Sequence, residues 1–205
     1  MRMSRDYFGV AAAIATACLV AGLPAALAAS SESGVKIGAD APAWAELEGI
    51  DGKMHALADV KDAKAVLVVF TCNHCPVAKA YEDRLVELYK DYHGQGVEVV
   101  AINVNNGESD KLPAMKERAK EKGFEFAYLY DPSQKIGRAF GATVTPHVFV
   151  LDGARKLAYM GAIDDNMKAD KATKHYVRDA LDAILASGSV ATTETKPAGC
   201  GIQYE

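Results

Sequence analysis

Two cysteines stand three positions apart where an apolar stretch of the chain meets an amphipathic one. Cys72 and Cys75 enclose Asn73 and His74, and the apolar run 65–70 precedes them. That run predicts a buried strand, and the following residues predict a helix that begins near Cys75. The unpaired N–H groups and the dipole of a helix N-terminus favour a thiolate, the form of cysteine that attacks disulfides. The spacing therefore predicts a redox-active dithiol with Cys72 as the attacking sulfur.

His74 adds a further prediction about the dithiol. A histidine just before the second cysteine can donate to the first thiolate or lie beside it as a partial cation, and either effect makes the disulfide a stronger oxidant. The same arrangement occurs in protein disulfide isomerase, whose potential is about −180 mV, against about −270 mV for thioredoxin. A structural zinc half-site is the alternative, but no second Cys-x-x-Cys and no His-x3–5-His follows. We therefore expect a redox pair with no metal and no cofactor.

The first residues have the pattern of an export signal. Arg2 and Arg5 form a short basic end, residues 8–27 are almost wholly apolar, and a small-x-small cleavage site ends at Ala28. An uncleaved membrane anchor is the alternative, because the apolar stretch is nearly long enough to span a bilayer. Cleavage would remove residues 1–28 together with Cys18. We expect a periplasmic protein, in a compartment kept oxidising.

Composition indicates one soluble domain. Half of the residues are hydrophobic, 24% are charged and the net charge is −4. No basic block or stripe is present, which argues against nucleic acid as a partner. The expected organisation is a signal peptide over residues 1–28, a domain over residues 29–186 and a flexible tail over residues 187–205 that contains Cys200. Breaks at glycine and proline predict alternating elements. Strands are expected around 44–47 and at 65–70, 97–102, 124–130, 147–151 and 156–160, and helices from about 75 and at 110–122, 131–140 and 171–186.

Two stretches together resemble a known superfamily. These are Phe-Thr-Cys-Asn-His-Cys-Pro (70–76) and Gly-Arg-Ala-Phe-Gly-Ala-Thr-Val-Thr-Pro-His-Val-Phe-Val-Leu-Asp (137–152). They are similar to the thioredoxin-like redoxins, which include alkyl hydroperoxide reductase and thiol-specific antioxidant proteins. The terminal Lys-Pro-Ala-Gly-Cys-Gly-Ile and Tyr-Leu-Tyr-Asp at 128–131 resemble an Asn-His-Cys-Pro branch of that group. The element order also fits an α/β thioredoxin-like fold, with a central mixed sheet flanked by helices and a redoxin-type insertion.

The resemblance implies roles for Thr145 and Pro146. It predicts a cis peptide bond between them, lying beside the Cys-x-x-Cys, with the backbone of Thr145 free to pair with an extended substrate peptide. The alternative is a proline that only starts a strand. The buried acid that thioredoxins keep in the central strand is missing from residues 65–70. Glu108 and His147 are therefore only guesses for the group that takes the proton from Cys75.

Cys200 lies between two glycines near the end of the chain. In a flexible tail, the glycines would let its thiol reach another sulfur. It is thus a candidate third redox thiol, which would resolve Cys72 or relay electrons. The alternative is a free or partner-linked thiol with no part in catalysis.

The favoured hypothesis is an exported thiol–disulfide oxidoreductase with Cys72 and Cys75 as its redox pair, His74 as the tuning residue and the Thr145–Pro146 loop presenting substrate. Its partners would be protein thiols or disulfides and a redox recycling partner, with a membrane involved only if the N-terminal segment is uncleaved. A thiol-dependent peroxidase is a second hypothesis. It is weakened because the peroxiredoxin motif Pro-x-x-x-Thr-x-x-Cys has Ala65 and Val69 at its Pro and Thr positions. The third is a Cu(I)-binding protein that uses Cys72 and Cys75, with His147 or Cys200 as a further ligand.

Overall fold

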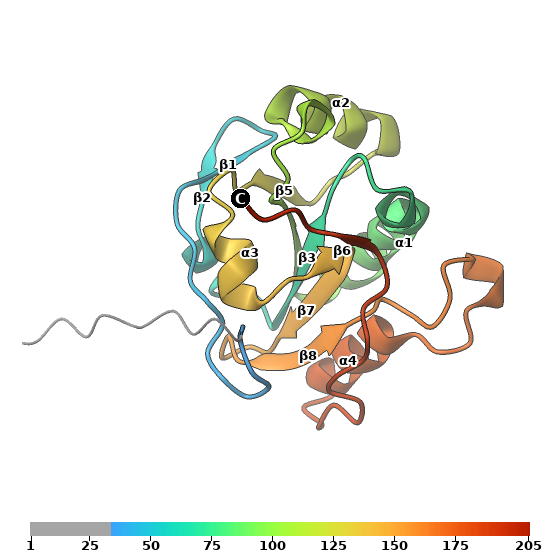
Figure 1. Ribbon diagram of the computed structural model, residues 1–205. Coiled ribbons are helices and arrows are strands. Elements are labelled where there is room, and N and C mark those ends of the chain that lie inside the picture. Colours follow the sequence, from blue (N-terminus) through green and yellow to red (C-terminus); the bar gives the residue numbers. More distant parts are fainter. Residues whose placement is uncertain (1–33) are drawn as a thin grey trace, which may run out of the picture.

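Seven strands form one mixed sheet in the computed structural model of the protein, which describes residues 34–205. Their order across the sheet is β2-β1-β5-β4-β3-β7-β8 (Figure 1). These strands are β1 (Leu47–Gly49), β2 (Met54–His55), β3 (Ala65–Thr71), β4 (Val97–Asn103), β5 (Ala127–Tyr130), β7 (His147–Leu151) and β8 (Leu157–Gly161). A second, two-stranded sheet joins β6 (Val144–Thr145) and β9 (Cys200–Gly201). The α-helices are α1 (Pro76–Tyr92), α2 (Leu112–Lys122), α3 (Lys135–Phe140) and α4 (Tyr176–Leu185).

Strand β3 lies inside the sheet and is buried along its whole length, as its apolar sequence predicts. Its alternate side chains enter two separate cores. Leu67 and Val69 pack in a cluster with residues of α1, α2 and α4. Val66, Val68 and Phe70 pack on the other face with residues of α3. The sheet therefore has helices on both faces, and α3 lies on the face opposite α1 (Figure 1).

Helix α1 begins where the sequence predicts. Its stripe of Tyr81, Leu85, Leu88 and Tyr92 is buried against the sheet, at spacings of four, three and four residues. Cys75 is the N-cap of this helix. The Cys-x-x-Cys segment is thus the short link between a buried strand and a helix that is packed on it, which fixes the position of both cysteines.

The topology brings the ends of three strands to one edge of the sheet. Strands β3 and β4 are parallel, so Thr71 and Asn103 are register partners at their carboxyl ends. Strand β7 runs antiparallel to β3 and pairs His147 with Phe70, so its beginning lies at the same edge. Residues that precede β7 and residues that follow β3 and β4 are therefore neighbours, although the chain separates them widely.

The last helix begins later than its apolar pattern predicts. The sequence indicates a helix from residue 171, whereas α4 starts at Tyr176. The Asp165 carboxylate accepts hydrogen bonds from the backbone N–H groups of Thr173 and Lys174. These bonds hold the preceding turn outside the helix, an effect of tertiary contact that hydrophobic spacing does not register.

The prediction of a loose tail over residues 187–205 is wrong for its last residues. Strand β9 pairs with β6, and Ile202 is buried in the core on the α3 face of the sheet, which we call the α3-side core. The side chain of Gln134 donates to the backbone carbonyl of Gln203. The sequence of the tail, which is rich in glycine and small residues, does not predict this packing, because the contacts are made largely by the backbone. The expected signal peptide over residues 1–28 and Cys18 lie outside the described residues. From residue 34 onward, no helix has the length and apolar character needed to cross a membrane.

Candidate active site

Cys75 is bonded to Cys200 in a disulfide, with a Cα–Cα distance of 5.9 Å. The expected partner, Cys72, is a free thiol. The structure thus corrects the pairing predicted from the sequence for this redox state, because the tail places Cys200 beside α1. The Sγ atom of Cys75 also accepts a hydrogen bond of 3.4 Å from the N–H of Ala78 and so caps the helix.

Cys72 lies at the end of β3 with only 2% of its surface exposed. Its Sγ is 3.0 Å from Oγ1 of Thr145, and backbone N–H groups of Cys75 and His74 also approach it. Burial raises the pKa of the Cys72 thiol, while these three hydrogen-bonding groups lower it and burial has the larger effect. In this arrangement burial therefore opposes the thiolate that the helix N-terminus is expected to favour, and the negative charge of Asp110 adds to that effect. Burial removes more solvation from the Cys72 sulfur than the nearby hydrogen-bond donors replace.

The predicted cis peptide bond between Thr145 and Pro146 is confirmed. Thr145 is buried and contacts both sulfurs of the Cys-x-x-Cys. Its hydroxyl is beside Cys72, and its carbonyl oxygen is 3.3 Å from Sγ of Cys75. The loop before β7 thus meets the segment after β3, as the shared sheet edge requires.

His74 is held by an acidic residue that the sequence analysis did not select. Nδ1 of His74 is 2.6 Å from Oδ2 of Asp110, whereas the imidazole itself is 46% exposed. The other carboxylate oxygen of Asp110 accepts a hydrogen bond of 2.7 Å from the N–H of Asn73. One buried carboxylate therefore fixes both central residues of the Cys-x-x-Cys motif.

A buried polar network continues from Asp110 behind the motif. The side-chain amide of Asn103, at the end of β4, lies 3.2 Å from Oδ1 of Asp110. The hydroxyl of Tyr128 donates to Oδ1 of Asn73 at 2.9 Å. Burial raises the pKa of Tyr128 well above its ordinary value, which keeps it a hydrogen-bond donor. The strand topology is the feature that could have predicted the place of Asp110. Because β3 and β4 are parallel neighbours, residues that follow β4 must lie beside residues that follow β3.

One cluster of potential metal ligands occurs among residues 34–205. Ligand atoms of Cys72, His74 and Asp110 all lie within 4.8 Å of one another. Both oxygens of Asp110 already accept hydrogen bonds from Asn73 and His74. The thiolate pair of Cys72 and Cys75 that the copper hypothesis needs is absent in this redox state, because Cys75 is in the disulfide. The contacts of Asp110 with Asn73 and His74 are those of a carboxylate that holds a histidine in one orientation, and they fit a metal centre less well.

Glu108 and His147, the two residues considered as acceptors of the proton from Cys75, lie in very different surroundings. Glu108 is 90% exposed and forms an ion pair with Lys111. His147 is buried, and its ring packs on Phe149 with centroids 4.5 Å apart. Burial lowers the pKa of His147 to about 4, so the imidazole is neutral between pH 5 and 8. Its Nδ1 accepts a hydrogen bond from the N–H of Thr143 rather than from a cysteine.

Buried His147 makes folding stability depend on pH. The unfolded chain takes up a proton near pH 6.5, whereas the folded chain does so only near pH 4. Stability is therefore expected to fall as the pH drops through this window, by about 2 kcal/mol at pH 5 from this group alone. Chemical denaturation at pH 7.5 and pH 5 measures the loss. In His147→Gln the loss should be smaller by about that amount, and an equal loss in both proteins would contradict the assignment.

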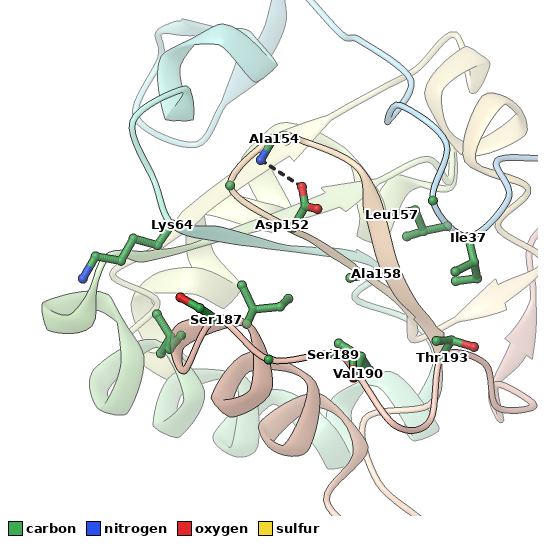
Figure 2. A pocket seen from close by; sticks show the side chains of 15 residues that line it. Ile37, Lys64, Asp152, Ala154, Leu157, Ala158, Ser187, Ser189, Val190 and Thr193 are labelled. Carbon is green, nitrogen blue, oxygen red and sulfur yellow. Dashed lines mark hydrogen bonds between the residues drawn. The ribbon is translucent and has the colours of Figure 1, made fainter.

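A large hollow lies at the opposite end of the sheet. It has a volume of about 850 Å³ and is lined by the β7–β8 turn and by residues that follow α4. Figure 2 shows the amine of Lys64 pointing away from it and the carboxylate of Asp152 bonded to the N–H of Ala154. No cysteine or histidine lines this hollow. The Cys-x-x-Cys motif and the His74–Asp110 pair lie at the other end of the sheet.

Comparisons with known proteins show what the chain is similar to. The model of the AhpC/TSA family matches residues 37–160. Thiol-disulfide oxidoreductase ResA of Bacillus subtilis is 31% identical over 147 residues, which is 71% of this chain and 78% of that protein. Thiol:disulfide interchange protein DsbE of Yersinia pestis is 28% identical over 132 residues, covering 63% of this chain and 66% of that protein. A crystal structure of a hypothetical protein from Sinorhizobium meliloti matches with a TM-score of 0.78 and 34% identity, covering 84% of this chain and 96% of that one.

Proposed function

We propose that this chain, which belongs to the AhpC/TSA family, exchanges disulfides with protein thiols through Cys72 and Cys75. The expected redoxin superfamily and thioredoxin-like fold are confirmed by the family match and by the related structures. The relatives named as thiol–disulfide oxidoreductases support this class of activity. The observation that carries the proposal is the site itself. A free Cys72 thiol lies beside a Cys75 that is already in a disulfide, at the junction of β3 and α1.

The exchange needs no group beyond the two thiols and the substrate. When the pair is reduced, the Cys72 thiolate attacks one sulfur of a substrate disulfide, and the other substrate sulfur leaves as a thiolate. The Cys75 thiolate then attacks Sγ of Cys72, which closes the Cys72–Cys75 disulfide and releases the second substrate sulfur. Two electrons pass to the substrate, whose thiolates take up protons. Oxidation of a substrate dithiol is the reverse of these steps.

Thr145 and the His74–Asp110 pair support the thiolate in this reaction. The Thr145 hydroxyl, 3.0 Å from Sγ of Cys72, can donate to the sulfur when it is charged. Asp110 holds Nδ1 of His74 and thereby sets which ring nitrogen carries the proton. The cationic form of His74 beside Cys72 would stabilise the thiolate and raise the potential of the couple, as the sequence predicts.

The protein is proposed to act outside the cytoplasm, in an oxidising compartment. The basic, apolar and small-residue regions of residues 1–28 support export, and a disulfide that closes on the site suits a compartment where thiols are oxidised. Its substrates would be proteins with accessible cysteines. A separate redox partner would recycle the dithiol.

The first test is the reduction potential of the Cys72–Cys75 couple, measured in glutathione buffers on Cys200→Ser so that the third thiol does not compete. A reversible two-electron couple is expected, and His74→Pro should move its potential toward the about −270 mV of thioredoxin. The thiols are quantified by alkylation and mass spectrometry at each buffer ratio. The proposal fails if Cys72 and Cys75 do not form a reversible couple in folded Cys200→Ser.

A further inference from the structure

The end of the chain lies on the active site as a strand. In the short sheet β9 runs antiparallel to β6, and its register pairs Cys200 with Thr145 and Gly201 with Val144. Figure 1 shows this segment, in dark red, crossing beside β6 between α1 and α3. Among the described strands, β9 is the only partner of β6. Without the tail, β6 would therefore present an open edge to which another extended segment could add.

Specific contacts hold the tail in this register. The backbone N–H of Ile202 donates to the carbonyl of Thr143, and the Ile202 side chain is buried in the α3-side core. Beyond it, the hydroxyl of Tyr204 donates to the carbonyl of Ala142. The tail is thus anchored on the far side of Cys200, and this anchor delivers the sulfur to Cys75.

Gly199, directly before Cys200, packs tightly against the backbone of Thr145. A Cβ atom at this position would lie 2.1 Å from the carbonyl oxygen of Thr145, which real Cβ atoms do not tolerate. A Cβ at Gly201 would meet nothing within 4 Å. Of the two glycines that flank Cys200, only the first is therefore required by the contact with Thr145.

We propose that the tail is a built-in substrate of the enzyme: β9 fills the edge of β6 where an extended substrate segment binds, and Cys200 holds Cys75 in a parked disulfide. This inference rests on the proposed disulfide exchange and extends it to a third redox thiol. It also specifies a substrate: a segment bound in the register of β9 has glycine before its cysteine, and that cysteine reacts with the Cys72–Cys75 disulfide at Sγ of Cys75, with Cys72 as the leaving thiolate. The sequence predicts that the Cys200 thiol moves freely in a flexible tail. The structure instead holds Cys200 in a strand of fixed register.

Release from the parked state is an internal exchange. The Cys72 thiolate attacks Sγ of Cys75, the Cys75–Cys200 bond breaks, and Cys200 leaves as a thiolate that takes up a proton. The product is the Cys72–Cys75 disulfide with an open β6 edge, and the chain as a whole is neither oxidised nor reduced. The three sulfurs are placed for this step, because Cys72 and Cys75 share one buried cluster against which Cys200 packs.

The test compares two glycine variants that keep all three thiols. Oxidised wild-type protein, Gly199→Ala and Gly201→Ala are quenched in acid, alkylated and mapped by mass spectrometry. Wild type and Gly201→Ala are expected to hold Cys75–Cys200 with Cys72 alkylated. In Gly199→Ala the fraction in that form should fall by about tenfold or more in favour of Cys72–Cys75. Equal fractions in the two variants, or a wild type with Cys200 alkylated throughout, would overturn the inference.

A peptide measurement tests the substrate specificity separately. Cys200→Ser, oxidised to the Cys72–Cys75 disulfide, is mixed with the reduced peptide Lys-Pro-Ala-Gly-Cys-Gly-Ile, and the rate of Cys72–Cys75 reduction is followed. The peptide with alanine in place of the glycine before cysteine should react about tenfold more slowly, whereas alanine after cysteine should have little effect. Equal rates for all three peptides would contradict the role of the β6 edge.

The two proposals fail in different ways. Activity of Cys200→Ser toward protein substrates, together with no Cys75–Cys200 in the wild type, would reject the tail inference alone. A Cys200→Ser protein that is folded but inactive toward every thiol would reject the disulfide exchange on which the inference rests. The expected result is an exchange rate higher in Cys200→Ser than in the wild type, because the site is no longer occupied.

Discussion

Replacing Cys72 with serine is expected to lower the rate of disulfide exchange by about a thousandfold or more, because a hydroxyl is a far weaker nucleophile toward sulfur than a thiolate. Cys72 is the free thiol of the site, buried at the end of β3 and beside the Thr145 hydroxyl. The measurement is the rate at which the protein catalyses reduction of a disulfide-containing protein such as insulin by dithiothreitol.

Cys75→Ser should behave differently from Cys72→Ser. It lacks the thiol that closes the Cys72–Cys75 disulfide, so mixed disulfides between Cys72 and substrate proteins should accumulate. Non-reducing gels with mass spectrometry detect them. Loss of activity with accumulation of mixed disulfides in Cys200→Ser, with Cys75 intact, would argue that Cys200, and not Cys75, is the resolving thiol. Retention of wild-type rates in Cys72→Ser would exclude Cys72 as the nucleophile.

Asp110→Ala is expected to destabilise the protein by about 2–4 kcal/mol, because it leaves buried donors without an acceptor. Asp110 is 1% exposed and accepts from the N–H of Asn73, from His74 and from the amide of Asn103. The same change frees His74 and removes the negative charge that raises the pKa of the Cys72 thiol, so the potential of the Cys72–Cys75 couple should shift as well. Urea denaturation gives the first effect and glutathione titration the second.

Glu108→Ala is the matched control for Asp110→Ala. Its carboxylate lies two residues away on the same turn, is exposed and pairs only with Lys111. An exposed pair of this kind contributes little, so the change in stability should stay within about 0.5 kcal/mol. Similar losses in the two variants would show that the turn, and not the buried carboxylate, supports the site.

Local sequence pattern predicted the elements that carry the cysteines. The apolar run before Cys72 became β3, and the stripe from Tyr81 to Tyr92 became the buried face of α1. Both depend on the period of hydrophobic residues, which is set by the geometry of the element itself. The Thr145–Pro146 motif was recognised through a family resemblance, and the structure bears out its position beside the sulfurs.

The network behind the motif escaped prediction because it joins distant segments. Asp110 lies 36 residues from His74, and Tyr128 lies 55 residues from Asn73. The parallel pairing of β3 with β4, and of β4 with β5, brings these residues to one edge. The order of the strands places Asp110 beside the motif, whereas hydrophobic periodicity identifies it only as the start of a helix.

Local sequence patterns predict a dithiol at a strand–helix junction, and the family resemblance predicts a proline loop and a fold that brings the two together. The tertiary structure decided which sulfur is bonded to which. Cys75 and Cys200 are separated by 125 residues, and what joins them is the pairing of β9 with β6 and the burial of Ile202. The spacing of cysteines in the sequence does not predict such a contact, because the contact depends on where the folded protein leaves a strand edge unpaired.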